Sequence, residues 1–261
     1  MMNTAELNPN LIAAPHEVGL SAKRLTCIST TSQKFIDEER LAGSVTVVAR
    51  RGKVAHFEAS GMMNVEASKP MQRDTIFPIY SMTKPIAAAA VMMLCEEGKL
   101  QLDAPASTYL PELGELKVAA DAEGESLTLV EADRDMTVRD LMRPHRRTAR
   151  GALEGKQLMK SESVELMTRN HLPEYLIPLD KKPDERYAGL GFGLGVSVRV
   201  QQTGWVPASQ VGEYGWIGGA STEFWISPRD ELVAITLAQH IPFSELSERV
   251  KPLAYAAILK E

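Results

Sequence analysis

Hydrophobic and polar positions alternate along two parts of the chain, one before residue 61 and one after residue 190. Residues 44–50 are β-branched and strand-like, residues 51–53 form a turn, and residues 54–60 return as a second strand, which is a hairpin signal. Further strands are predicted in the last third of the chain, at residues 191–200, 213–221, 222–226 and 231–240.

A helical period separates and flanks these strands. Residues 21–41 are amphipathic, with Leu25, Ile28, Phe35 and Ile36 as candidate core positions. Further helices are predicted from residue 83 or 85 to 98, at residues 135–142 with Thr137 as candidate N-cap, and at residues 161–170 and 243–259. The helix that ends at Gly98 is apolar nearly all round, so we expect it to be buried.

Strands at both ends of the chain, with helices between them, predict an α/β (α+β) fold. Its central antiparallel sheet is formed from both chain ends and flanked by helices. The 261 residues, 44% of them hydrophobic, suffice for a single domain with one sizeable core.

Charge and composition exclude several classes of partner. A net charge of −5 offers no basic face for nucleic acid. The start has no basic leader, and the longest apolar stretch, residues 86–95, is about half a membrane span. We therefore expect a cytoplasmic protein that does not bind membranes. The lone Cys27 and Cys95 predict two buried, reduced thiols.

Metal and cofactor motifs are absent from the sequence. The histidines include no H-x-x-x-H pair, so a metal site is not expected. The glycine-rich residues 189–195 lack the Lys-Ser/Thr ending of a phosphate loop, and a closely packed strand is the better interpretation. No cofactor is predicted.

Ser81 and Lys84 form a Ser-x-x-Lys motif at a predicted loop-to-helix junction. A serine at a helix start lies near the positive end of the macrodipole, which favours a developing alkoxide. A lysine three residues on lies on the same face and reaches the hydroxyl, and burial would disfavour its charged form, so it can act as a base. Chance alone yields this tetrapeptide pattern about once in such a chain, so the motif needs its context.

That context resembles the nucleophile segment of the serine β-lactamase superfamily. Residues 74–86, which read Asp-Thr-Ile-Phe-Pro-Ile-Tyr-Ser-Met-Thr-Lys-Pro-Ile, are most similar to family VIII carboxylesterases, which are close to class C β-lactamases. The resemblance continues through residues 41–43, 50–53, 96–100, 102–105, 109–112, 136–141, 212–222 and 224–228. Together it covers most of residues 17–142 and 151–245.

The resemblance implies an acyl-enzyme mechanism. Ser81 would attack an ester or lactam carbonyl, Lys84 would take its proton, and the backbone N–H groups of Ser81 and Gly219 would form the oxyanion hole. Tyr80, beside the nucleophile, is either a cleft residue or a core tyrosine.

The tripeptide Trp216-Ile217-Gly218 occupies the place of the lactamase Lys-Thr-Gly motif. Trp216 thus replaces a lysine whose positive charge would suit a substrate carboxylate. This replacement favours an esterase that acts on an uncharged small-molecule ester. The family usually has Trp-Gly-Gly here, so Ile217 is a departure that would narrow the site.

One family feature is missing from this chain. None of its six tyrosines begins the Tyr-x-Asn or Tyr-x-Ser motif that assists proton transfer in these enzymes. Family members are longer, so residues 100–175 are interpreted as the remnant of a helical lobe, with a deletion near residues 143–151. The basic cluster there is either frame-shifted sequence or a solvated loop; it comprises Arg143, Arg146, Arg147 and Arg150.

Three functions remain open at this point: a serine esterase or related acyltransferase, a catalytically impaired homologue, and a weak β-lactamase. A reduced lobe would expose the helix of residues 86–95, which leaves self-association open.

Overall fold

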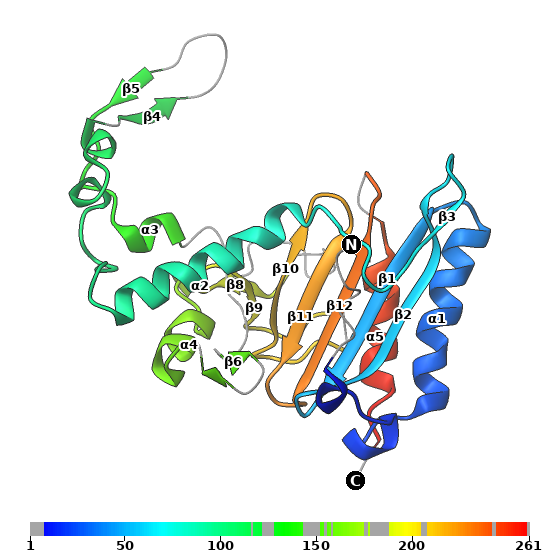
Figure 1. Ribbon diagram of the computed structural model, residues 1–261. Helices are drawn as coiled ribbons and strands as arrows, with labels where there is room; N and C mark the ends of the chain where they lie inside the picture. Colours follow the sequence, from blue (N-terminus) through cyan, green and yellow to red (C-terminus); the bar gives the residue numbers. More distant parts are fainter. Residues whose placement is uncertain are drawn as a thin grey trace.

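The computed structural model describes residues 8–115, 117–121, 128–142, 152–153, 156–157, 159–174, 177, 188–204, 208–241 and 244–259. Its dominant feature is an antiparallel sheet with the strand order β3-β2-β1-β12-β11-β10-β9-β8 (Figure 1). The strands are β1 Gly43–Arg50, β2 Lys53–Asn64, β3 Lys69–Pro70, β8 Leu190–Phe192, β9 Ser197–Arg199, β10 Tyr214–Gly218, β11 Thr222–Ser227 and β12 Leu232–Ala238. Because β1 pairs with β12, the two ends of the chain form one sheet, as predicted.

Helices lie on both sides of this sheet. Helices α1 (Ala22–Asp37) and α5 (Leu246–Ala256) pack together on one face. Helix α2 (Thr83–Glu96) extends from the other side, preceded by the 3-10 turn η3 (Tyr80–Met82) (Figure 1). Smaller elements complete the described chain: η1 Pro9–Leu11, η2 Pro15–Val18, η4 Ala106–Thr108, η5 Pro111–Glu115, α3 Val138–Met142, α4 Ser161–Thr168, and the hairpins of β4 Val118–Asp121 with β5 Thr128–Val130 and β6 Ala152–Leu153 with β7 Lys156–Gln157.

Alternation along the central strands gives each face of the sheet its own core. On β11, Trp225 packs with α1 and α5, whereas its neighbour Phe224 packs on the opposite face with Met82 of η3. Successive side chains of a strand point to opposite faces, so one strand supplies both cores. Both aromatic residues are buried.

The predicted Thr137 cap is confirmed at the start of α3. The Asp140 amide N–H donates to Thr137 Oγ1 at 3.2 Å, and the Thr137 amide N–H donates to a carboxylate oxygen of Asp140 at 3.0 Å. These reciprocal bonds satisfy two backbone donors that the helix itself leaves unpaired. The side-chain hydrogen bond from Arg134, above all, holds the pKa of the Asp140 carboxyl well below its usual range.

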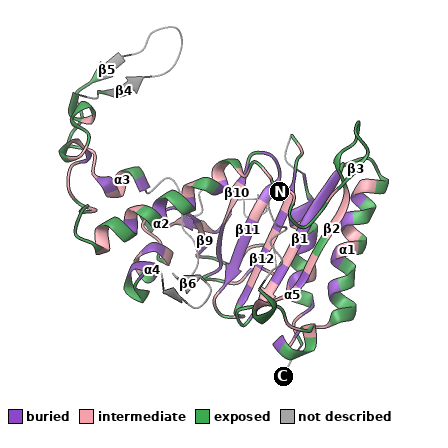
Figure 2. Ribbon diagram, viewed as in Figure 1, coloured by how far each residue is buried: buried purple, intermediate pink, exposed green. Residues whose placement is uncertain are grey.

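The prediction that α2 is buried all round is wrong. Its buried residues are Pro85, Ala88 and Met92, while Ile86 is 59% exposed and Met93 and Leu94 are each 37% exposed (Figure 2). The described residues of α3 and α4 pack on one side of the helix only, so its other side meets solvent. Within the described residues, no helix combines the length and the apolar character needed to cross a membrane.

Two further expectations are corrected. Cys27 is exposed and Cys95 is half-buried, so both thiols are free but neither is buried. The single strand predicted at residues 191–200 is two strands, β8 and β9, because the chain turns between them with Gly195 at a φ of 93°. The predicted deletion and the basic cluster at residues 143–151 lie outside the described residues.

Candidate active site

Ser81 and Lys84 are brought together where η3 runs into α2. Lys84 Nζ donates a hydrogen bond to Ser81 Oγ at 2.7 Å, and both residues are half-buried. A separation of three residues at a helix start puts both side chains on one face, as the sequence predicted. The local fold therefore brings the two groups into hydrogen-bond contact.

Tyr80 holds an unusual backbone conformation directly before Ser81. Its φ is +47°, in the left-handed region that bulky residues rarely occupy. Such a residue costs about 1–3 kcal/mol and persists only where surrounding contacts enforce it. The strained turn presents Ser81 at the end of α2 that faces the sheet, and the Tyr80 side chain itself is 52% exposed, so it is not a core tyrosine.

The loop before Ser81 is attached to three strands of the sheet. Thr222 Oγ1 of β11 donates to the Ile79 carbonyl at 3.3 Å, and Gln239 Nε2, after β12, donates to the Pro78 carbonyl at 3.5 Å. On β10, Gly218 lies so close that an added Cβ would be 2.3 Å from the Ile79 carbonyl oxygen. The missing side chain of Gly218 thus permits the contact that sets the distance between Ser81 and β10.

Trp216 lies on β10, and Gly219 is the residue directly after this strand. Trp216 is half-buried and packs edge-on against Phe192 of β8, with ring centroids 6.1 Å apart. Gly219 is exposed, and a Cβ there would lie 4.0 Å from the Tyr80 ring. Alternation places Ile217 on the opposite face of β10 from Trp216 and Gly218, so its predicted narrowing of the site has no support from this geometry.

Apart from Tyr80, the tyrosines of the described chain are engaged elsewhere. Tyr109 Oη accepts from the Gln101 amide at 2.9 Å, Tyr214 is buried among core residues, and the Tyr255 hydroxyl donates to Glu213. Burial, and then the Glu213 carboxylate, raises the pKa of Tyr255 far above its ordinary value. None of these hydrogen bonds involves Ser81 or Lys84. Tyr175 and Tyr187 lie outside the described residues.

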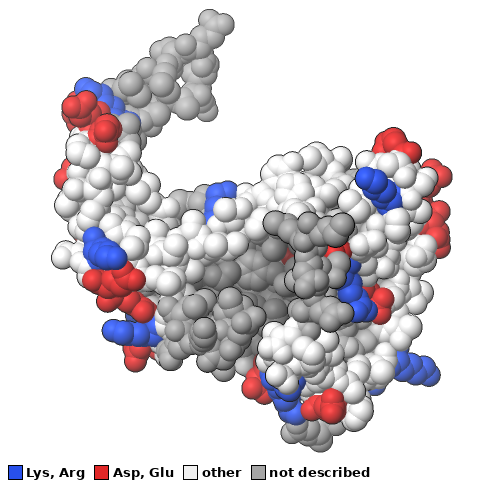
Figure 3. All heavy atoms as spheres, in the orientation of Figure 1, with Lys and Arg blue, Asp and Glu red and all other residues white. Residues whose placement is uncertain are grey.

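Charged side chains are scattered over the face shown in Figure 3. Lysines and arginines lie interspersed with aspartates and glutamates, while the surface over α2 is largely uncharged. In the described residues, no group of three or more His, Cys, Asp or Glu side chains is placed to hold a metal ion. The sequence identified Ser81, Lys84 and Trp216, but it contained no signal for the supporting roles of Thr222, Gln239 and Phe192.

A Ser-x-x-Lys pair at a helix start, facing an antiparallel sheet of this topology, defines a β-lactamase/transpeptidase-like fold. Residues 28–146 match the family described as "Beta-lactamase". Esterase EstB of Burkholderia gladioli is 39% identical over 111 residues, covering 42% of this chain and 27% of EstB. A β-lactamase of Pseudomonas fluorescens is 31% identical over 86 residues, covering 33% of this chain and 24% of that enzyme.

Solved structures agree on the fold. EstCE1, described as a hydrolase with promiscuous acyltransferase activity, aligns with a TM-score of 0.68 at 19% identity, covering 89% of this chain and 99% of EstCE1. Simvastatin synthase (LovD) of Aspergillus terreus aligns with a TM-score of 0.74 at 14% identity, covering 90% of this chain and 98% of LovD. Through residues 28–146 and through its fold, the chain is similar to the serine β-lactamase superfamily, including its esterases. Its match spans only about a quarter of the length of the curated relatives named here.

Proposed function

We propose that the protein is a serine hydrolase of the carboxylesterase type, with Ser81 as nucleophile and Lys84 as base. The observation that carries the proposal is the 2.7 Å contact between Lys84 Nζ and Ser81 Oγ. A nucleophile within hydrogen-bond reach of its base is the signature of an activated hydroxyl. The curated relatives include an esterase and a β-lactamase, which supports a hydrolase in general.

The reaction proceeds in two displacements. With its amine unprotonated, Lys84 takes the Ser81 hydroxyl proton while Oγ bonds to the ester carbonyl carbon, and the C–O bond to the alcohol breaks as that proton passes to the leaving oxygen. Water then attacks the acyl carbon of the acyl-enzyme and loses a proton to Lys84. The bond between the acyl carbon and Ser81 Oγ breaks, Lys84 returns the proton to Oγ, and the carboxylic acid leaves. The N–H groups of Ser81 and Gly219 stabilise the oxyanion in both steps.

An uncharged ester fits this site better than a β-lactam carboxylate. Trp216 stands at the position where lactamases have lysine, and it packs against Phe192 rather than presenting a cation. Tyr80, 52% exposed beside Gly219, supplies a second aromatic wall. We therefore expect short-chain or aryl esters as substrates, bound by apolar contacts to these rings.

The reduced lobe lowers the expected rate. Among the described residues, no tyrosine is hydrogen-bonded to the Ser81–Lys84 pair, and we infer that Lys84 returns the proton to the leaving group without help from a tyrosine. A missing general acid typically costs about 10²–10⁴-fold in rate. We infer a single domain whose residues 100–175 are a remnant lobe, with slow but serine-dependent hydrolysis.

Hydrolysis of short-chain p-nitrophenyl esters tests the proposal. Ser81→Ala is expected to abolish the serine-dependent rate, whereas Ser161→Ala, on the exposed start of α4, should leave it unchanged. Mass spectrometry after a p-nitrophenyl phosphonate should show one adduct, located on Ser81. Equal ester rates in the parent and Ser81→Ala proteins, with no adduct, would identify an inactive homologue, and nitrocefin turnover exceeding ester turnover would favour a lactamase.

A further inference from the structure

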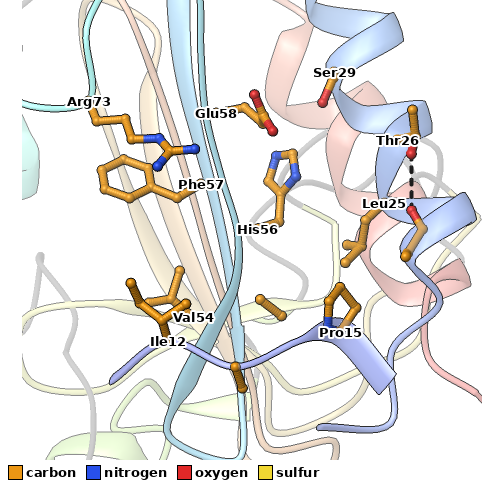
Figure 4. A pocket seen from close by; sticks show the side chains of 13 residues that line it. Ile12, Pro15, Leu25, Thr26, Ser29, Val54, His56, Phe57, Glu58 and Arg73 are labelled. Atoms are coloured by element: carbon orange, nitrogen blue, oxygen red, sulfur yellow. Dashed lines mark hydrogen bonds between the residues drawn. The ribbon is translucent and has the colours of Figure 1, made fainter. Parts of the chain in front are cut away.

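We propose that a cavity at the outer edge of β2 binds a small zwitterion with an apolar side group, such as a hydrophobic α-amino acid. The cavity has a volume of about 330 Å³, within the range of small-molecule sites. It lies between α1, the segment of residues 12–15 and the open side of β2 (Figure 4). In the sheet, β1, β12 and β11 separate β2 from β10, so the cavity is distinct from the candidate active site.

Opposite charges flank the cavity without pairing with each other. Arg73 and Glu58 both line it and are exposed, and no ion pair joins the two within the described residues. The Arg73 guanidinium lies 5.3 Å from the centroid of the Phe57 ring, which holds it at the rim. A ligand with a carboxylate for Arg73 and an ammonium for Glu58 satisfies both groups.

His56 provides a buried polar group on the cavity wall. The residue is 7% exposed, and one ring nitrogen, Nε2, is hydrogen-bonded to Thr46 Oγ1 at 2.8 Å. Burial, and then the positive charge of Arg73, lowers the pKa of His56 to about 4, so the imidazole is neutral at physiological pH. Figure 4 draws the His56 ring, the Ser29 hydroxyl and the Glu58 carboxylate on the same side of β2, and all three residues line the cavity. The Glu58 carboxylate and the Ser29 hydroxyl are acceptors for a ligand ammonium.

Most of the remaining lining residues are apolar, and Thr26 is the exception. Leu25, Val54 and Pro15 contribute to the floor, and the Ala13 amide donates to the Val54 carbonyl at 3.0 Å, which seals the lower end of the β2 edge. Charged groups at the rim with an apolar floor below them match an amino acid whose side chain is aliphatic or aromatic. The available volume suits a ligand of that size rather than a folded partner.

Titration calorimetry of the full chain with L-leucine tests the proposal. Two analogues serve as matched probes: 4-methylpentanoate lacks the ammonium group, and 3-methylbutylamine lacks the carboxylate. We expect each analogue to bind at least about tenfold more weakly than L-leucine, because each loses one charge-assisted contact. Ser81→Ala should bind L-leucine as the parent does, which separates this site from the proposed hydrolysis.

Two exposed substitutions assign the contacts. Arg73→Gln should weaken L-leucine binding about tenfold and leave 3-methylbutylamine unaffected, while Glu58→Gln should weaken L-leucine and leave 4-methylpentanoate unaffected. Arg249→Gln, an exposed arginine on α5, makes the same change in charge as the first variant and should have no effect. The proposal is overturned if L-leucine shows no saturable binding at about 10 mM, or if Arg73→Gln and Arg249→Gln bind it equally.

Discussion

Gly218 offers the most direct test of how the sheet positions the nucleophile. A Cβ at this position would lie 2.2 Å from Thr222 Oγ1 and 2.3 Å from the Ile79 carbonyl oxygen. The φ of Gly218 lies outside the left-handed region, so an alanine here meets a steric clash without backbone strain. To reach ordinary van der Waals contact, the Ile79 carbonyl must move away by roughly 1 Å.

This displacement acts on stability and on catalysis in different amounts. Overpacking of this kind costs about 1–3 kcal/mol of unfolding free energy. Ile79 lies two residues before Ser81, and a misplacement of about 1 Å in catalytic geometry can cost about 10²-fold in rate. We therefore expect Gly218→Ala to remain folded while kcat/KM for a p-nitrophenyl ester falls by about two orders of magnitude.

Thermal unfolding and ester kinetics on the same preparations measure both effects. Gly219→Ala adds the same methyl group one residue later, where the nearest atom is 4.0 Å away, so its unfolding temperature should match the parent. Adding Thr222→Ala to Gly218→Ala removes one of the two clashing atoms and should recover part of the lost stability. An ester rate for Gly218→Ala within about threefold of the parent would refute the idea that this contact positions Ser81.

Further predictions concern the base and two buried groups. Lys84→Met should lower kcat by about 10²–10⁴-fold at unchanged stability. Lys99→Met, which changes an exposed lysine after α2, should leave kcat unchanged. Equal rates in the parent and Lys84→Met proteins would exclude Lys84 as the base. Lys251→Met leaves the Glu213 carboxylate buried without the Lys251 ammonium and should lower the free energy of unfolding by denaturant by about 3–5 kcal/mol. Adding Glu213→Gln should recover most of this free energy, and no recovery would contradict the Lys251–Glu213 pairing. Because the pKa of His56 falls from 6.5 to about 4 on folding, the unfolded chain binds more protons, and stability should decline as pH falls from 6.5 towards 4. His56→Gln should show a smaller decline over that window, and an identical decline would exclude a contribution from His56.

Features that depend on neighbouring residues could be predicted from the sequence. The Ser81–Lys84 contact follows from helical spacing, and the Thr137 cap needs only the residue three positions on. The pairing of the N-terminal hairpin with a C-terminal strand followed from where the strands lie along the chain. These interactions are decided by backbone periodicity and local hydrogen bonding.

Helix α2 shows where sequence reasoning failed. Its composition is that of a buried helix, yet Ile86 is 59% exposed because the described neighbours pack on one side only. Amphipathicity indicates which side of a helix can be buried, but an apolar helix carries no such signal. The number of its packing neighbours depends on other parts of the chain.

The sequence by itself determined the spacing that brings Lys84 to Ser81 and the antiparallel sheet built from both ends of the chain. Tertiary structure alone decided that Gly218 touches the Ile79 carbonyl, and that Arg73 and Glu58 flank one cavity at the edge of β2. The physical reason is sequence distance. A side-chain periodicity of two or 3.6 residues can be recognised from consecutive residues of the sequence. A contact between β10 and the loop before Ser81 exists only once the whole sheet has formed.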